Sequence, residues 1–180
     1  MNIKFKNIYG KDKEISLINQ INEEAFPLEE RVPISTIIAF ADKGKGKLLG
    51  AYDQDEFIGF VLIIIKNNVG YLFLLAVEKS KRNQGYGSLI LQEIFKKYEN
   101  IQINLDFEIL DPLAPNYEIR LRRKAFYLRN GLKETGHYTT LDNGYKFEIV
   151  TNKLPFNQEG LLEVLKILHT EVDNYPAKIL

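Results

Sequence analysis

The chain has 180 residues, of which 45% are hydrophobic and 27% are charged, so it can bury the core of one domain and is not of the disordered class. Lysine plus arginine equals aspartate plus glutamate at 24 each, which excludes a strong overall attraction to nucleic acid or to an anionic membrane. The absence of cysteine excludes disulfides, zinc–thiolate sites and thiol nucleophiles.

The first residues alternate like a strand and lack the apolar stretch of a signal peptide. No apolar run approaches the roughly 20 residues that a membrane helix needs. His137 and His169 have no potential metal ligands at useful spacing, so no metal site is predicted. We therefore expect a soluble cytoplasmic protein without a metal, a nucleic-acid partner or a membrane partner.

Apolar periodicity defines the elements of the first half of the chain. Alternation predicts a strand over residues 2–8, and helical spacing predicts a helix from residue 12 to about 25 and a second over 34–41. Three strands separated by tight turns follow, over residues 47–52, 56–66 and 69–77. The third is almost entirely apolar, as expected for a strand buried on both faces.

The second half alternates helices and strands. We expect a helix over residues 86–98, a strand over 101–109, a basic helix over 117–129 that ends at Gly131, and a hairpin of 132–141 and 145–150 around Asp142-Asn143-Gly144. The basic face of the helix over 117–129 is predicted to be solvated. A final amphipathic helix carries Leu161, Leu165, Leu168 and Val172.

This order of elements predicts an α/β (α+β) fold with a mixed, mostly antiparallel central sheet flanked by helices. Residues 1–150 are expected to form the main domain, and residues 151–180 a helical extension packed on it. Two interpretations of the extension stay open: it caps the sheet, or it forms a homodimer interface.

The turn after the third apolar strand is the most informative segment. It is basic and places Gly85 and Gly87 where a helix begins. Backbone N–H groups at a helix start have no internal partner, and glycines let a phosphate approach them. The alternative is a plain strand–helix turn. We interpret the turn as a phosphate site formed by Arg82, Asn83, Gln84, Gly85, Tyr86, Gly87 and Ser88, with charge from Lys79 and Lys81.

The spacing Arg-x-x-Gly-x-Gly, directly after Leu75-Ala76-Val77, resembles the GCN5-related N-acetyltransferase (GNAT) family. The segment from Tyr127 to Gly131 and Leu132 resembles the family's later Tyr-x-x-x-Gly-Phe signature. The resemblance spans roughly residues 2–150. It implies a GNAT-like fold with acetyl-CoA as cosubstrate, its pyrophosphate in the turn, and a primary amine of a small molecule or peptide as the acetyl acceptor. The family commonly has Gly at the position of Asn83.

The same resemblance implies roles for individual residues. The acyl-pantetheine would lie in a split between the strands over 69–77 and 101–109, where backbone N–H groups of Leu75 and Val77 would hold it. Tyr127 would be the general acid that protonates the leaving thiolate. The alternative for Tyr127 is a core tyrosine with its hydroxyl at the edge of the core.

The general base is less defined by the resemblance, because the strand glutamate of many relatives is replaced here by Phe73. Asp106 and Glu108 share one face of the next strand, and a pKa raised by burial would suit either as the base. The open alternative is that both face solvent or pair with arginines of the following helix.

In proteins that this chain resembles, the first two helices and their connection cover the acceptor side. Phe26 would be part of an apolar wall, Glu29 and Glu30 would attract a cationic amine, and Arg31 would bind a carboxylate or pair with a glutamate. The alternative is that Phe26 only docks the helices while the charges face water. A second class of function also stays open: a catalytically silent acyl-CoA-binding sensor or interaction module.

Overall fold

The computed structural model describes residues 1–26, 28, 31–140, 144–172 and 178–180. Every helix and strand expected from the sequence is present. The elements are β1 (Ile3–Asn7), α1 (Ile15–Ala25), α2 (Ile34–Asp42), β2 (Lys47–Asp53), β3 (Glu56–Lys66), β4 (Val69–Val77), the 3₁₀ helix η1 (Lys79–Lys81), α3 (Tyr86–Lys97), β5 (Gln102–Glu108), α4 (Tyr117–Arg129), β6 (Lys133–Thr140), β7 (Lys146–Thr151) and α5 (Gln158–His169).

Two details differ from the sequence prediction or lie beyond it. Helix α5 ends at His169, so Val172 is not one of its residues, although the Val172 N–H still donates to the carbonyl of Leu168. The predicted turn between β6 and β7 includes Asp142 and Asn143, which lie outside the described residues. The predicted end of α4 is confirmed, because Gly131 follows the helix with a φ of 91°, a left-handed conformation that favours glycine.

The chain forms two compact units. Unit 1 comprises Met1–Ile65 and Leu72–Lys97, and unit 2 comprises Lys66–Tyr71 and Tyr98–Leu180. The division runs through β4, and α5 belongs to unit 2 together with β5, β6 and β7.

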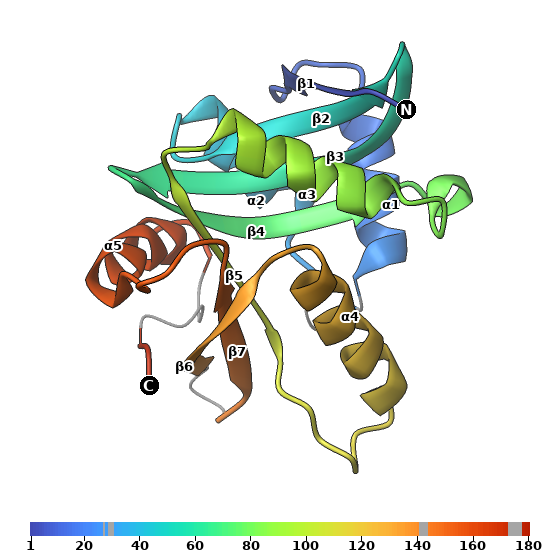
Figure 1. The fold of residues 1–180 in the computed structure, drawn as a ribbon. Helices are drawn as coiled ribbons and strands as arrows, with labels where there is room; N and C mark the ends of the chain where they lie inside the picture. Colours follow the sequence, from blue (N-terminus) through green and yellow to red (C-terminus); the bar gives the residue numbers. More distant parts are fainter. Residues whose placement is uncertain (27, 29–30, 141–143, 173–177) are drawn as a thin grey trace. The chain divides into compact units, whose positions relative to one another are not determined.

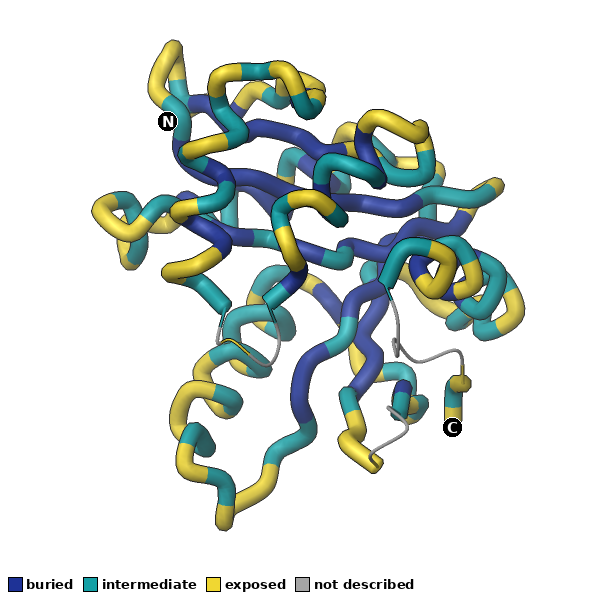
Figure 2. The backbone as a smooth tube through the Cα atoms, turned by 180° about the vertical axis from the view of Figure 1, so that it is seen from behind, coloured by how far each residue is buried: buried dark blue, intermediate teal, exposed yellow. Residues whose placement is uncertain are grey.

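Unit 1 is a sheet layer covered by helices. Its strands follow the order β1-β2-β3-β4, with β1 antiparallel to β2 and β2 antiparallel to β3. Helix α3 covers one face of these strands, and α1 and α2 cover the other (Figure 1). The strand backbones are the most buried part of the unit (Figure 2), and its largest fully buried side chains include Phe40, Phe60, Ile18, Ile21 and Ile37.

Unit 2 continues from the first residues of β4 in the order β4-β5-β7-β6. Strand β5 is parallel to β4 over Val69–Tyr71 and antiparallel to β7, which is antiparallel to β6. Helix α5 buries its apolar stripe of Leu161, Val164, Leu165 and Leu168. The predicted fold class, a mixed and mostly antiparallel sheet flanked by helices, is confirmed. Among the described residues, no helix is both long enough and apolar enough to cross a membrane.

Candidate active site

The phosphate turn, residues 82–88, has the backbone that an anion site requires. Asn83 and Gly85 adopt positive φ angles of 61° and 86°. Glycine takes this conformation freely and asparagine tolerates it, so Asn83 supports the conformation at a position where the family commonly has glycine. The Leu89 N–H donates to the carbonyl of Gly85, which starts α3. The N–H groups of the first turn of α3 therefore have no partner within the helix, and the helix dipole favours an anion there.

Side chains from unit 1 hold the phosphate turn in place. The Arg82 Nε donates to the carbonyl of Val77 at 2.9 Å, which ties the turn to the end of β4. The Gln84 amide donates to the carbonyl of Ser80 at 2.7 Å, and the Tyr86 hydroxyl donates to Asp53 at 3.1 Å. The buried Nη2 of Arg82 has no hydrogen-bond partner within the described chain. A buried guanidinium donor without a partner is consistent with a site that receives an anion.

The charge of the neighbouring lysine is already balanced. Lys81 lies 2.7 Å from Glu56 on β3, and the hydrogen bond from Lys81 to that carboxylate raises the pKa of Lys81. Lys81 therefore anchors the turn to β3 rather than offering a free charge to a phosphate. This leaves Arg82 as the better placed cation of the segment.

The end of β4 is fixed by a close approach of two strands of unit 1. A Cβ at Gly59 on β3 would lie 2.2 Å from the carbonyl oxygen of Ala76, so only glycine fits there. The Glu78 N–H donates to the carbonyl of Ile58 at 2.9 Å, one residue before Gly59. Leu75 and Val77, the predicted backbone donors to the thioester, lie on this segment of β4.

Tyr127 lies on α4 and stacks on Phe107 of β5, with ring centroids 5.4 Å apart and planes 16° apart. Burial raises the pKa of the Tyr127 hydroxyl; Arg123 opposes this and Asp106 adds to it. The hydroxyl therefore stays protonated at neutral pH. Within the described residues it makes no hydrogen bond, so its proton is available to a ligand.

Asp106 of β5 accepts one hydroxyl hydrogen bond on each carboxylate oxygen. The Tyr71 hydroxyl donates to Oδ1 at 2.7 Å, and the Thr139 hydroxyl donates to Oδ2 at 2.5 Å. Burial raises the pKa of Asp106, and the two hydroxyl groups partly offset that rise. A carboxylate with a raised pKa is a suitable proton acceptor near neutral pH.

Glu108, two residues further along β5, has a different environment. Its carboxylate lies 2.7 Å from Arg120 and 3.2 Å from Arg123 of α4, and it accepts a hydrogen bond from the Asn116 amide at 3.3 Å. The alternative left open by the sequence, pairing with arginines of the following helix, is the arrangement seen for Glu108. Both oxygens of the Glu108 carboxylate are therefore held by cationic side chains of α4.

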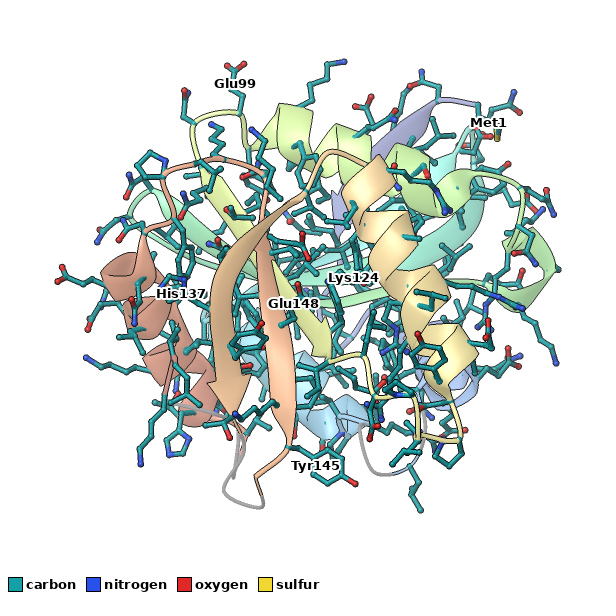
Figure 3. The ribbon with its side chains drawn as sticks, turned by 60° about the horizontal axis from the view of Figure 1, so that its bottom comes forward. Met1, Glu99, Lys124, His137, Tyr145 and Glu148 are labelled. Atoms are coloured by element: carbon teal, nitrogen blue, oxygen red, sulfur yellow. The ribbon has the colours of Figure 1, made fainter. Side chains whose placement is uncertain are left out.

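The basic helix α4 is paired rather than solvated along part of its length, contrary to the sequence expectation. Lys124 lies 2.6 Å from Glu134 and 2.9 Å from Glu148, and Figure 3 shows Lys124 and Glu148 directed toward one another. With Arg120 and Arg123 on Glu108, these contacts join α4 to β5, β6 and β7. A shallow groove of about 380 Å³ beside them is lined by Ile109, Leu110, Lys124, Tyr138, Lys146 and Glu148.

The predicted acceptor segment is described only in part. Phe26 is half-buried, and Arg31 donates to the carbonyls of Glu23 and Phe26 at 2.8 and 3.1 Å, which caps the C-terminal end of α1. Glu29 and Glu30 lie outside the described residues. Sequence reasoning missed Tyr71 and Thr139, because nothing in the local pattern marks side chains that reach Asp106 from 35 and 33 residues away.

The sequence also matches a family of known proteins. Residues 15–118 match the model of the acetyltransferase (GNAT) family. The chain belongs to the GNAT family. It is therefore an acyltransferase, and the resemblance inferred from the turn and from the Tyr127 segment is confirmed at the level of the family.

Solved structures of GNAT proteins share the fold. A GNAT-family protein from Bacteroides thetaiotaomicron is 23% identical, with a TM-score of 0.76 over 96% of this chain and 99% of that one. An aminoglycoside 6′-N-acetyltransferase complexed with coenzyme A is 20% identical, with a TM-score of 0.64 over 82% and 95%. A GNAT acetyltransferase from Elizabethkingia anophelis with acetyl-CoA bound is 14% identical, with a TM-score of 0.59 over 85% and 99%. No curated protein matches the sequence.

Proposed function

We propose that this GNAT protein transfers the acetyl group of acetyl-CoA to a primary amine of a small molecule or peptide. The observation that carries the proposal is the phosphate turn, where left-handed Asn83 and Gly85 precede the N–H groups of a helix start, which have no partner within the helix. Coenzyme A carries a pyrophosphate that this geometry suits. The coenzyme A and acetyl-CoA bound by two proteins of the same fold support this choice of cosubstrate.

In the proposed reaction the amine nitrogen attacks the thioester carbon directly. A C–N bond forms and the C–S bond breaks, giving an N-acetylated product and coenzyme A. Backbone N–H groups of Leu75 and Val77 are proposed to hold the thioester carbonyl and the pantetheine. No metal ion is required by this scheme.

A cationic amine loses one proton before it attacks and a second from the tetrahedral intermediate, and the leaving thiolate gains one, so three proton transfers complete the chemistry. Tyr127 is proposed to give its proton to the leaving thiolate, since burial keeps the hydroxyl protonated and, within the described residues, the hydroxyl makes no hydrogen bond. Asp106 is proposed to take the proton of the amine, and Glu108 is a second candidate that would first have to release its arginines. The second amine proton passes to solvent, and exchange with solvent then returns Tyr127 and Asp106 to their starting states.

The acceptor is proposed to meet the α1–α2 connection. Phe26 would contribute an apolar wall, and Glu29 and Glu30 would attract the cationic amine. The contacts of Arg31 with the end of α1 support a role in shaping this segment. Selectivity between small amines and peptide amines would then depend on these few residues.

The direct test is thiol release from acetyl-CoA in the presence of a panel of polyamines, aminoglycosides, amino acids and peptides, with mass spectrometry of the acceptor. We expect at least one amine to gain an acetyl group in step with thiol release. Tight coenzyme A binding without acetylation of any amine would instead favour a silent acyl-CoA-binding module. Failure to bind coenzyme A would contradict the proposal altogether.

A further inference from the structure

The carboxylate of Asp106 is held by hydroxyl groups from two other strands of unit 2. Tyr71 of β4 and Thr139 of β6 each donate to one of its oxygens, at 2.7 and 2.5 Å. Tyr71 is 2% exposed and Thr139 is fully buried, so both donors are fixed within the protein. A carboxylate oxygen can accept more than one hydrogen bond, so each Asp106 oxygen keeps a lone pair for an incoming proton.

Backbone pairing sets the positions of these donors. Tyr71 is the last residue of β4 paired with β5, and its partner is Asn104, two residues before Asp106 on the same face. The Asn104 amide donates to the carbonyls of Gly70 and Gln102, both at 3.2 Å, and so joins the two strands at the end of their pairing. The Tyr71 side chain reaches forward from this point to Asp106.

The donor on the other side is equally constrained. Thr139 pairs with Phe147 of β7, and Asp106 pairs with Ile149 two residues further along the same strand. Thr139 also forms a bridge with Ile179, and Tyr138 and Leu180 exchange backbone hydrogen bonds at 2.9 and 2.7 Å. Both hydroxyl groups are therefore oriented by strand pairing before any ligand binds.

Among the described residues, the remaining hydrogen bond to the Asp106 carboxylate comes from its own backbone N–H, which also favours the ionised form. Ile149, its partner on β7, is apolar and fully buried. From α4, Tyr127 interacts with Asp106 only through space, and Arg123 pairs with Glu108 on the neighbouring position of β5. The two hydroxyl hydrogen bonds favour the ionised form of Asp106, while burial disfavours it.

We propose that Tyr71 and Thr139 are positioning residues for proton transfer from the acceptor amine to Asp106. Both keep their own protons and donate hydrogen bonds throughout, so the proton that moves passes only from the amine nitrogen to an Asp106 oxygen. Their effect is to keep Asp106 ionised in a buried place and to hold its plane fixed. This inference rests on the base role given to Asp106 in the proposed function.

The test compares Tyr71→Phe and Thr139→Val with Thr139→Ser, which shortens the residue but keeps the hydroxyl. The pKa of Asp106 is measured by NMR titration of carboxyl-labelled aspartate, with Asp106→Asn used to assign its signal. We expect the pKa of Asp106 to rise by about one pH unit in each hydroxyl-deleted variant, since hydrogen bonds to a charged group favour that charged form. Thr139→Ser should match the parent.

The same variants are then assayed for acetyl transfer across pH. The acidic limb of the rate profile should move upward with the Asp106 pKa in Tyr71→Phe and Thr139→Val, and stay in place in Thr139→Ser. An unchanged Asp106 pKa in both deletions would overturn the inference and leave the base role to be judged from Asp106→Asn. If the Asp106 pKa moves but the acidic limb of the rate profile does not, Asp106 is not the base. The hydroxyl groups would then act on a carboxylate that the reaction does not use, and the positioning role would be overturned.

Discussion

The phosphate turn of unit 1 and the carboxylates of unit 2 are built in different ways. The turn depends on backbone torsions at Asn83 and Gly85 and on a helix that begins directly after them. Asp106 depends instead on hydroxyls from Tyr71 and Thr139, which are 35 and 33 residues away in the chain. A turn made of consecutive residues can be predicted from the local sequence, whereas the protonation of a carboxylate depends on side chains that only the fold brings to it.

Changes in unit 2 should affect turnover and leave coenzyme A binding unchanged, and Tyr127→Phe should show the largest such effect. Loss of the proposed general acid should lower kcat by about 10²- to 10⁴-fold on the true acceptor. The dissociation constant for coenzyme A, measured by calorimetry, should stay at the parent value, because the phosphate turn is unchanged. Tyr117→Phe, which removes a hydroxyl from the same helix, is the matched control. Parent-like rates in Tyr127→Phe would reduce Tyr127 to a packing role.

The two carboxylates of β5 should differ in their pH behaviour. A general base works when ionised, so the parent rate should rise with pH through the raised pKa of Asp106. Asp106→Asn should lose this acidic limb and about 10²-fold in rate, the lower end for such catalysis because water can accept the amine proton. Glu108→Gln should keep the limb. A limb lost in Glu108→Gln would transfer the role to Glu108, and parent-like profiles in both would indicate a water chain or selection of neutral amine.

For the free energy of unfolding, in contrast, Glu108 should be the important carboxylate of β5. Glu108→Gln leaves Arg120 and Arg123 without their anion, and removing one partner of a buried pair costs about 3–5 kcal/mol. Because the Arg123 side chain is 31% exposed, we expect a loss of about 2–3 kcal/mol in the free energy of unfolding. Denaturant unfolding at neutral pH measures it, with Glu159→Gln as a control from the first turn of α5. A loss below that of the control would mean that Glu108 and the two arginines are not coupled.

Changes in the α1–α2 connection should affect acceptor binding alone. Glu29→Gln and Glu30→Gln together should raise the acceptor KM about fivefold, equivalent to about 1 kcal/mol, which is the upper end for one ion pair in water. The KM for acetyl-CoA should not change, because only acceptor binding is lost. Unchanged acceptor kinetics in the double variant would place selectivity elsewhere.

The smallest effect is expected for Arg31→Met. The guanidinium donates to carbonyls at the end of α1, and a cation there is worth about 0.3–1 kcal/mol of stability. The change should appear in thermal unfolding and not in the KM for acetyl-CoA. A large rise in acceptor KM without any loss of stability would instead assign Arg31 to the acceptor.

The sequence allowed the order of elements, the fold class and the turn that leads into α3 to be predicted, because each is a local pattern of apolar spacing, glycine or helix start. Gly131 ending α4 is of the same kind. The end of α5 before Val172 was not predictable, since an apolar residue at helical spacing does not require the helix to continue. The different environments of Asp106 and Glu108 were also not predictable, because both lie on the same face of β5 and differ only in partners from other elements.

The account depends most on coenzyme A binding through the phosphate turn, and denaturant unfolding with and without coenzyme A tests this directly. Coenzyme A at 100 times its dissociation constant should raise the free energy of unfolding of the parent by about 2.7 kcal/mol. The control Gln92→Val introduces a valine at an exposed position of α3, and coenzyme A should raise its free energy of unfolding by the same amount. Gly87→Val, whose side chain would block the approach of a phosphate to the backbone, should gain almost nothing. An equal gain in a folded Gly87→Val variant would contradict the account.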